Sequence, residues 1–241
     1  KVSIESYLAK IKQQGVGVMS QKNSKLEFVL RKLQSLSGFL PLCIFLLFHV
    51  VANATAIAGP DVYYGFIHIM GNIPGIIVLE VLIIFLPLLV HGLMGLYIVF
   101  TGRNNPMQYP YFRNRMFFFQ RVSGVVIFVF LIYHVLTVKY GSDHSAALMM
   151  VNLYEQFHSP IFGAFYIITL ICVSFHVCNG LWGFCVNWGI LPGMRAQRVF
   201  GKICIVLFVI LLVFWLFVFA AIYRIDGGLI EQLNLMSQFG L

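Results

Sequence analysis

The sequence predicts an all-α integral membrane protein, a five-helix bundle, and two observations carry this prediction. The first is composition: of 241 residues, 60% are hydrophobic and 10% charged, with a mean hydropathy of +0.90, which leaves too little polar surface for a soluble globule. The second is that five segments reach the roughly 20 apolar residues a membrane-crossing helix needs: 37–57, 74–100, 118–138, 160–187 and 200–223. One transmembrane domain, 37–223, therefore lies between an N-terminal segment, 1–36, and a tail, 224–241.

The basic residues give the predicted bundle an orientation. Of the 16 lysines and arginines, 14 precede the first helix or lie between helices two and three or four and five, and only Lys139 and Arg224 lie on the other side. By the positive-inside rule, the N-terminal segment is cytoplasmic and the tail lies outside. The net charge of +8 thus reflects membrane topology, and we expect no nucleic-acid partner.

Each of the first four helices carries one histidine. The first runs outward to His49, and the second runs inward past Glu80 and then His91. These last two are eleven residues apart, a spacing that a regular helix places on one face. The third helix runs outward to His134 and the fourth inward through His176. The fifth carries no histidine and no carboxylate within its predicted span and is expected only to pack.

The first four helices resemble a duplicated pair. Helices two and four share a pattern, HGLMGLY from His91 and HVCNGLW from His176. Helices one and three both open with a glutamine, a serine and a glycine and reach a histidine: Gln34, Ser37, Gly38 and His49 in one, Gln120, Ser123, Gly124 and His134 in the other. The spacing from glutamine to histidine is 15 residues in helix one and 14 in helix three. Such self-similarity predicts a two-helix unit used twice.

Four intramembrane histidines in a repeated pattern indicate cofactor ligands. A lone buried histidine is more often a hydrogen-bonded core residue, but imidazole is costly in lipid and four in a pattern need an explanation. Counting depth along alternating helices puts His49 and His134 in the outer half and His91 and His176 in the inner half. Two imidazoles on facing helices suit six-coordinate haem iron, whereas zinc or copper usually gathers three or four ligands. We therefore expect two haems b, with these four histidines as iron ligands.

Other residues fit around two such groups. Gly95 and Gly180 follow His91 and His176 by one turn and would let a flat macrocycle approach, although small residues also serve helix packing. Haem propionates favour arginine, serine and glutamine donors. The candidates for these contacts are Arg31, Ser35, Ser37, Arg121 and Ser123. For the two arginines, the positive-inside rule alone is an equally good explanation.

Two haems stacked across a bilayer would conduct electrons, and the apolar redox carrier dissolved in a bilayer is a quinone. Quinone chemistry moves protons, so a carboxylate is expected nearby. Glu80 lies about 16 Å outward of His91 by helical rise, near the level of the outer haem, and is the candidate for proton transfer. The alternative is a buried glutamate bonded to a neighbouring helix. His68, in the outer loop expected at 58–73, is a weaker candidate for the quinone site.

Several stretches resemble the single-chain, five-helix, di-haem cytochrome b membrane anchors of succinate:quinone oxidoreductases, in the form found in Bacillus and its relatives. They are LRKLQSLSG with FHV, LEVLIIFLPLLVHGLMGLYIVFTGRNN, YFRNRMFFFQRVSG, and FHVCNGLWGF with VNWGI, within residues 28–222. The resemblance implies that His49 and His134 bind the distal haem and His91 and His176 the proximal one. It also implies a succinate dehydrogenase or fumarate reductase in the bacterial cytoplasmic membrane, with flavoprotein and iron–sulfur subunits on the cytoplasmic face and menaquinone as the quinone.

The sequence departs from that family at two positions. Gly71 stands where the Bacillus form has an aspartate near the quinone site, and Ser174 stands where a fumarate reductase anchor has a proton-transferring glutamate. Two other interpretations of the histidines stay open. One is a di-haem cytochrome b anchor of a hydrogenase, formate dehydrogenase or nitrate reductase; the other is a transporter or passive membrane scaffold with histidines on a proton path.

Overall fold

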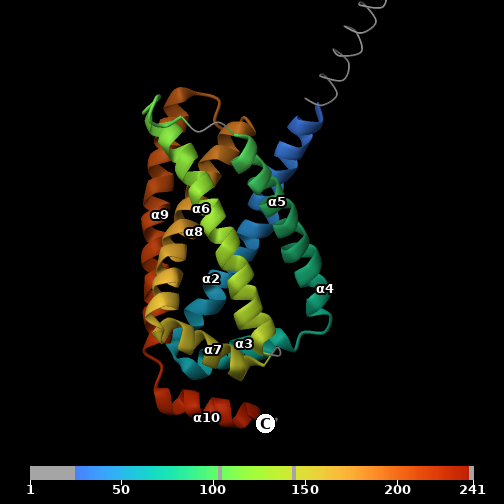
Figure 1. Cartoon of the computed structure of the whole chain (residues 1–241), viewed down its shortest axis with the longest axis vertical. Helices are drawn as coiled ribbons and strands as arrows, with labels where there is room; N and C mark the ends of the chain where they lie inside the picture. The colour runs from blue at the N-terminus through green and yellow to red at the C-terminus, as the bar shows by residue number, and fades with distance from the viewer. Residues whose placement is uncertain (1–24, 103–104, 143–144, 239–241) are drawn as a thin grey trace, which may run out of the picture.

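The computed structural model describes residues 25–102, 105–142 and 145–238, and it confirms the all-α prediction (Figure 1). Within these residues there is no strand, and five helices are long and apolar enough to cross a membrane: 25–58, 76–101, 112–142, 160–187 and 194–223. The first, third and fifth begin earlier than predicted because their polar leading residues include no glycine or proline to stop a helix. Helical structure is thus already present at residue 25, within the segment expected to precede the membrane.

Shorter elements interrupt or join these five helices. After helical residues 25–37, the elements are η1 (Gly38–Leu42), α2 (Cys43–Ala58), α3 (Pro60–Gly71), α4 (Ile76–Glu80), η2 (Val81–Phe85), α5 (Leu86–Thr101), α6 (Phe112–His134), η3 (Val135–Lys139), η4 (Tyr140–Ser142), α7 (Ala146–His158), α8 (Pro160–Asn187), α9 (Met194–Tyr223) and α10 (Gly227–Gln238). The elements η1, η2 and η3 are π-helical turns, which are uncommon and often found at functional sites.

The π turn η1 reconciles the two unequal halves of the repeat. A π turn holds one residue more than an α turn, and η1 lies between Gln34 and His49, where the spacing exceeds that from Gln120 to His134 by one residue. The π turn accommodates the extra residue, so each histidine projects in the same direction relative to the glutamine of its own helix. Pro41 lies inside η1 and cannot donate a regular helical hydrogen bond, which is consistent with the local widening.

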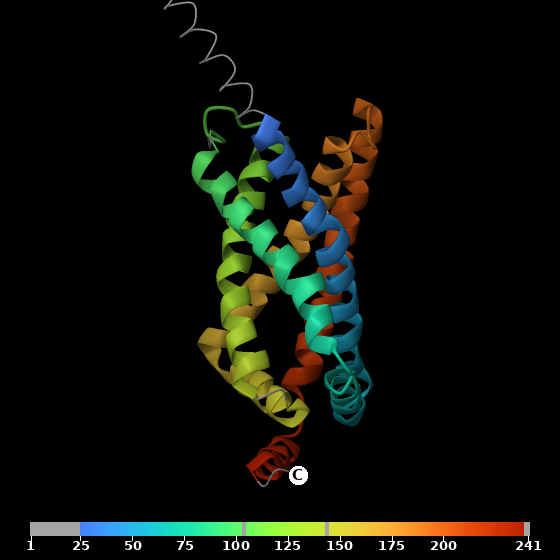
Figure 2. The same ribbon diagram turned by 90° about the vertical axis from the view of Figure 1, so that its right-hand side faces the viewer.

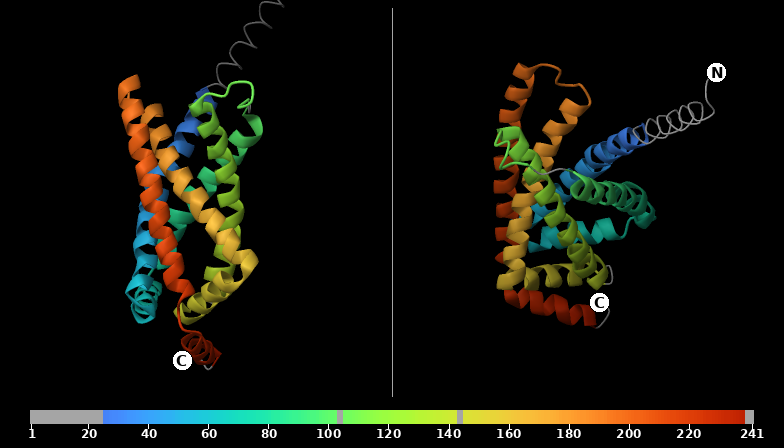
Figure 3. Two further views of the ribbon diagram at one scale, coloured as in Figure 1. Left: turned by 90° about the vertical axis from the view of Figure 1, so that its left-hand side faces the viewer. Right: turned by 45° about the horizontal axis from the view of Figure 1, so that its top comes forward.

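Three short helices lie across one end of the bundle (Figures 1 and 3). The helix α3 joins the first two transmembrane helices, α7 joins the third and fourth, and α10 follows the fifth. The loop expected at 58–73 is therefore mostly helical, and Pro60 in its first turn and Asp61 next to it favour this helix start. The tail likewise contains a helix, and α7 packs against α3, α8, α9 and α10.

The two ends of the bundle differ in charge. All described aspartates and glutamates except Glu27 lie at the end covered by α3, α7 and α10: Asp61, Glu80, Glu155, Asp226 and Glu231. The other end, with the connections at 105–111 and 188–193, carries most of the described basic residues. We call these the acidic end and the basic end.

Tight packing is concentrated near the acidic end. The core cluster there includes Met150, Val218 and Ile222, each at most 2% exposed. By contrast, α4, η2 and α5 contribute no buried residue. Figure 2 shows this second transmembrane helix crossing the front of the bundle. Protein side chains alone therefore do not enclose it.

Candidate cofactor site

Two pairs of histidines face one another inside the bundle. The inner pair, nearer the basic end, is His91 of α5 and His176 of α8, whose ring centroids are 6.2 Å apart. The outer pair, nearer the acidic end, is His49 of α2 and His134 of α6, with centroids 6.1 Å apart. The two rings of each pair are inclined at 83°. Counting depth along the sequence predicts this pairing, and the geometry agrees.

The separation within each pair suits a metal ion between the rings. A metal–nitrogen bond of about 2 Å, with roughly 1 Å more from nitrogen to ring centre on each side, puts two imidazoles on one metal about 6 Å apart. The two pairs are also well separated from each other. Tyr166, which contacts His134, precedes His176 by ten residues on α8. Ten residues correspond to roughly 15 Å of helical rise.

The repeated glutamine and serine hold the inner pair. His91 Nδ1 lies 2.9 Å from the carbonyl oxygen of Gln34, and since a carbonyl can only accept, Nδ1 must donate. His176 Nδ1 lies 3.2 Å from Ser123 Oγ, whose own proton is donated to the Gln120 carbonyl at 3.1 Å. Each ring is thereby held through Nδ1–H, which leaves the Nε2 lone pair for a metal.

The repeated glycine makes room for the same two rings. A Cβ added to Gly38 would lie 2.5 Å from His91 Nδ1, and one added to Gly124 would lie 3.1 Å from His176 Cε1. The first approach is closer than real side chains allow and the second is tight. Helix one thus seats the histidine of helix two, and helix three seats that of helix four. This is the structural basis of the repeat.

The outer pair is held from α7 and α8. His134 Nδ1 lies 3.1 Å from the Tyr166 hydroxyl, and that hydroxyl donates its proton to Gln156 Oε1 at 3.0 Å. The hydroxyl oxygen is therefore left to accept from His134 Nδ1–H. In three of the four histidines, the proton is thus assigned to Nδ1 and the lone pair to Nε2.

The remaining histidine, His49, is positioned through its backbone. Asn53 Nδ2 donates to the His49 carbonyl at 2.8 Å, and Asn53 Oδ1 accepts from the Tyr63 hydroxyl at 3.1 Å. Tyr63 lies on α3 and is buried, and burial raises the pKa of its phenol. The hydroxyl therefore stays a donor at neutral pH.

Further observations fit a large planar cofactor bound by each pair. Gly95 has no heavy atom within 4 Å of an added Cβ, so helix packing does not explain it, whereas Gly180 would approach Gln120 Nε2 at 3.2 Å. Trp215 Nε1 and Thr169 Oγ1 are buried without a hydrogen-bond partner among the described residues, and the Trp215 ring lies 6.2 Å from that of His49. Two imidazole nitrogens per site are the donor set of bis-histidine haem.

The first two predicted propionate contacts are engaged with protein groups. Arg31 is exposed and forms an ion pair of 2.8 Å with Glu27, one turn earlier on the same helix. Ser35 Oγ accepts a hydrogen bond of 3.3 Å from Trp188 Nε1. Both residues lie at the basic end, on its partly exposed surface.

The other three predicted contacts lie deeper. Ser37 Oγ donates to the Gln34 carbonyl at 3.0 Å, as Ser123 does to the equivalent carbonyl in the second half. Arg121 is buried, its guanidinium lies 4.1 Å from the Phe117 ring centroid, and it rests against the backbone of Gly102. These three residues line the inner pair's end of the bundle.

Glu80 is not bonded to His91. It forms an ion pair with Lys139 at the end of η3, and the two side chains are 19% and 25% exposed respectively. The π turn η2 lies between Glu80 and His91 and changes their relative direction by roughly 100°, so the shared face predicted for them is wrong. Lys139 follows His134 by five residues, roughly 7 Å of rise, which puts Glu80 near the outer pair.

The structure shows the local surroundings of His68, the weaker quinone-site candidate, and of Gly71 and Ser174, the two departures from the family. His68 is exposed on α3, where its Nε2 lies 3.3 Å from Asn72 Nδ2, and no described contact joins it to a histidine pair. Gly71 has open space around an added Cβ. Ser174 is fully buried and donates to the Leu170 carbonyl at 2.8 Å.

Three neighbours of the outer pair were not predicted from the sequence. Tyr166 is one of many aromatic residues in an apolar helix, and only its hydroxyl could have marked it. The position of Lys139 in the sequence indicates topology, and a lone cation at the outer end of a helix also requires a partner. The fifth helix contains no histidine or carboxylate, so the sequence predicts only packing for Trp215.

The fold and the paired intramembrane histidines define a helical membrane protein built to hold cofactors between its helices. The family described as the succinate dehydrogenase/fumarate reductase transmembrane subunit matches residues 110–214. The succinate dehydrogenase cytochrome b558 subunit of Bacillus subtilis (strain 168) is 39% identical over 188 residues, which cover 77% of this chain and 92% of that protein. The chain belongs to this family of succinate dehydrogenase and fumarate reductase membrane subunits.

Proposed function

We propose that this chain anchors a succinate dehydrogenase or fumarate reductase in the membrane and carries its electrons through two haems b. The observation that supports this most directly is the pair of facing imidazoles at each of two depths, with 6.1 and 6.2 Å between centroids. The cytochrome b558 relative makes haem b the cofactor to test first. When bound, haem b supplies a one-electron couple.

The protein side chains would bind and orient these haems. His91 and His176 would ligate the proximal haem and His49 and His134 the distal one. Hydrogen bonding at Nδ1 fixes the tautomer and orientation of three of these rings and raises the basicity of Nε2. Arg121 is the candidate cation for propionates at the inner level.

The charge distribution supports an orientation with the basic end in the cytoplasm. The flavoprotein and iron–sulfur subunits would then dock at that end, next to the inner pair, and electrons would pass between them and the outer pair. This orientation puts the acidic end, with α3, α7 and α10, on the outside.

Glu80 and Lys139 are the proposed proton-handling groups for menaquinone near the outer pair. Quinone reduction consumes protons and quinol oxidation releases them, so a carboxylate close to the outer cofactor has a chemical role. The ion pair with Lys139 would orient the Glu80 carboxylate. His68 is exposed and has no described contact with a histidine pair, so it is a weaker candidate for proton transfer than Glu80.

The haem assignment can be tested on the full chain purified with its haem. We expect two haems per chain and a low-spin bis-histidine spectrum, and His91→Ala and His134→Ala should each remove one haem. Matched controls are His68→Ala and His158→Ala, because both histidines lie outside the pairs on short helices. A chain that purifies without haem, or pair variants that keep two haems, would overturn the proposal.

A further inference from the structure

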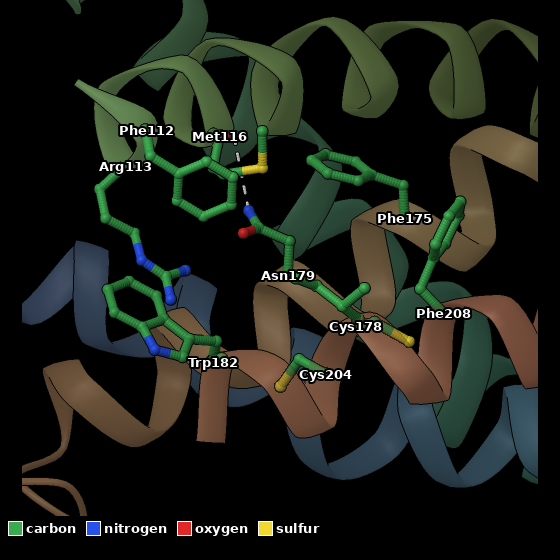
Figure 4. A pocket seen from close by; sticks show the side chains of 11 residues that line it. Phe112, Arg113, Met116, Phe175, Cys178, Asn179, Trp182, Cys204 and Phe208 are labelled. Carbon is green, nitrogen blue, oxygen red and sulfur yellow. Dashed lines mark hydrogen bonds between the residues drawn. The ribbon is translucent and has the colours of Figure 1, made fainter. Parts of the chain in front are cut away.

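A cavity of about 50 Å³ lies among α6, α8 and α9 toward the basic end, and no histidine lines it (Figure 4). Its polar lining is the guanidinium of Arg113 and the amide of Asn179, and that amide donates to Gln120 Oε1 at 2.8 Å. Its deeper walls include Phe175, Ile205 and Phe208. By the volume that a water-sized group occupies, roughly 10–15 Å³, there is room for a short run of methylene groups. None of these residues has a role in the proposed electron transfer.

Arg113 is held in a defined place at this cavity. Its guanidinium lies 3.6 Å from the Trp182 ring centroid, and Figure 4 shows the two side chains next to each other. The Trp182 ring is itself fixed, because its Nε1 donates to the Gln197 carbonyl at 3.0 Å. A Cβ on Gly201 would overlap the Arg113 guanidinium, so this glycine permits the position.

The charge of Arg113 has no internal counterpart in the described structure. The only described carboxylate at the basic end is Glu27, which is bonded to Arg31, and no described carboxylate pairs with Arg113. Exposed Arg198 and Lys202 add positive charge to the same end. A planar guanidinium in this setting is suited to a phosphate, which it can bind through two parallel hydrogen bonds.

The depth of the cavity points to a lipid as the source of that phosphate. Arg113 is the second residue of α6, at the beginning of a helix long and apolar enough to cross a membrane, where we expect lipid head groups. From Trp182 to Phe175 on α8 is seven residues, roughly 10 Å of rise toward the bilayer centre. The walls over that length are apolar, and Ile205 is 53% exposed on the outside of the bundle, so an acyl chain can reach them from the membrane.

We infer that this cavity binds one anionic phospholipid, with its phosphate on Arg113 and part of an acyl chain against Phe175, Ile205 and Phe208. A free phosphate would leave the apolar walls uncovered, and a zwitterionic lipid would bring its own cation to the basic end. The bound lipid would cover the groove between α6 and α9.

The test uses the full chain purified with haem, native mass spectrometry, and phosphatidylglycerol or phosphatidylcholine as probes. The wild type should retain one phosphatidylglycerol in preference to phosphatidylcholine, and Arg113→Gln should lower that retention about fivefold, the effect of one basic side chain at a membrane surface. Gly201→Ala should lower it too, because the charge remains but is displaced. Arg198→Gln is the matched control, exposed at the same end and outside the cavity.

Three outcomes of the retention measurements would overturn the inference. They are unchanged retention in Arg113→Gln, an equal loss in Arg198→Gln, and equal retention of the two lipids. Complete displacement of the lipid by millimolar inorganic phosphate would also overturn it, because the acyl groove would then contribute nothing. Haem content of each sample is measured in parallel, so failure of the lipid site is distinguishable from failure of the haem proposal.

Discussion

Substituting Gly38 tests whether the repeated motif positions the inner histidine pair. In Gly38→Ala the new Cβ would lie 2.5 Å from His91 Nδ1, against a normal contact of about 3.5 Å, so the ring must retreat by about 1 Å. Functional sites tolerate displacements of roughly 0.5 Å. At Gly124 the corresponding distance is 3.1 Å, to His176 Cε1, so Gly124→Ala requires a shift of only about 0.4 Å.

The expected result is graded. Gly38→Ala should purify with about half the wild-type haem, whereas Gly124→Ala should keep both haems with an altered inner-site spectrum. The assay is haem-to-protein ratio with absorption and electron paramagnetic resonance spectra of the purified full chain. Gly65→Ala is the matched control, because an added Cβ there meets nothing within 4 Å on α3. Two haems with unchanged spectra in Gly38→Ala would refute the reasoning, as would loss of haem from the control.

Three further predictions concern the outer pair. Tyr166→Phe removes the acceptor of His134 Nδ1–H, which lowers the basicity of that ligand. The midpoint potential of one haem should therefore rise by up to about 40 mV, the one-electron equivalent of a hydrogen bond of about 1 kcal/mol. An unchanged redox titration would contradict this prediction. Glu80→Gln should leave both haems in place but slow quinol-driven haem reduction about 100-fold in stopped-flow measurements; a normal rate would exclude the carboxylate from proton transfer. Trp215→Phe removes a buried N–H beside His49 and should lower the potential of the outer haem only; equal shifts in both haems would indicate a general packing defect.

The placement of the histidines was predictable because it depends only on helical rise and alternating direction. His49 and His134 lie at similar depth on two outward helices, and no detail of packing can change that. The same count cannot give the direction in which a side chain points once a helix contains a π turn. Glu80 shows this, because η2 rotates it away from the face of His91 and toward Lys139.

The short helices and the hydrogen-bond partners of the histidines were harder to predict. The segment that forms α3 contains glycines and a proline, a composition that favours a loop. In the structure, Pro60 begins a helix, and the buried Tyr63 of this helix donates a hydrogen bond to Asn53. Tyr166 and Gln156 meet His134 only because α7 lies across the end of the bundle. Such contacts depend on tertiary arrangement, which the periodicity of one segment does not contain.

The widened turn η1 locates an insertion in the duplicated sequence. Aligning the first two helices with the next two needs a one-residue gap, and it belongs within 38–42, the only part of the first helix that is not regular α-helix. A chain lacking Pro41 can form an uninterrupted helix with the 14-residue spacing of the second half, and it should still hold two haems. A one-residue deletion within 125–130 has no widened turn to relax before His134, and it would swing that histidine about 100° out of the pair. The earlier half therefore tolerates a change of length that the later half does not.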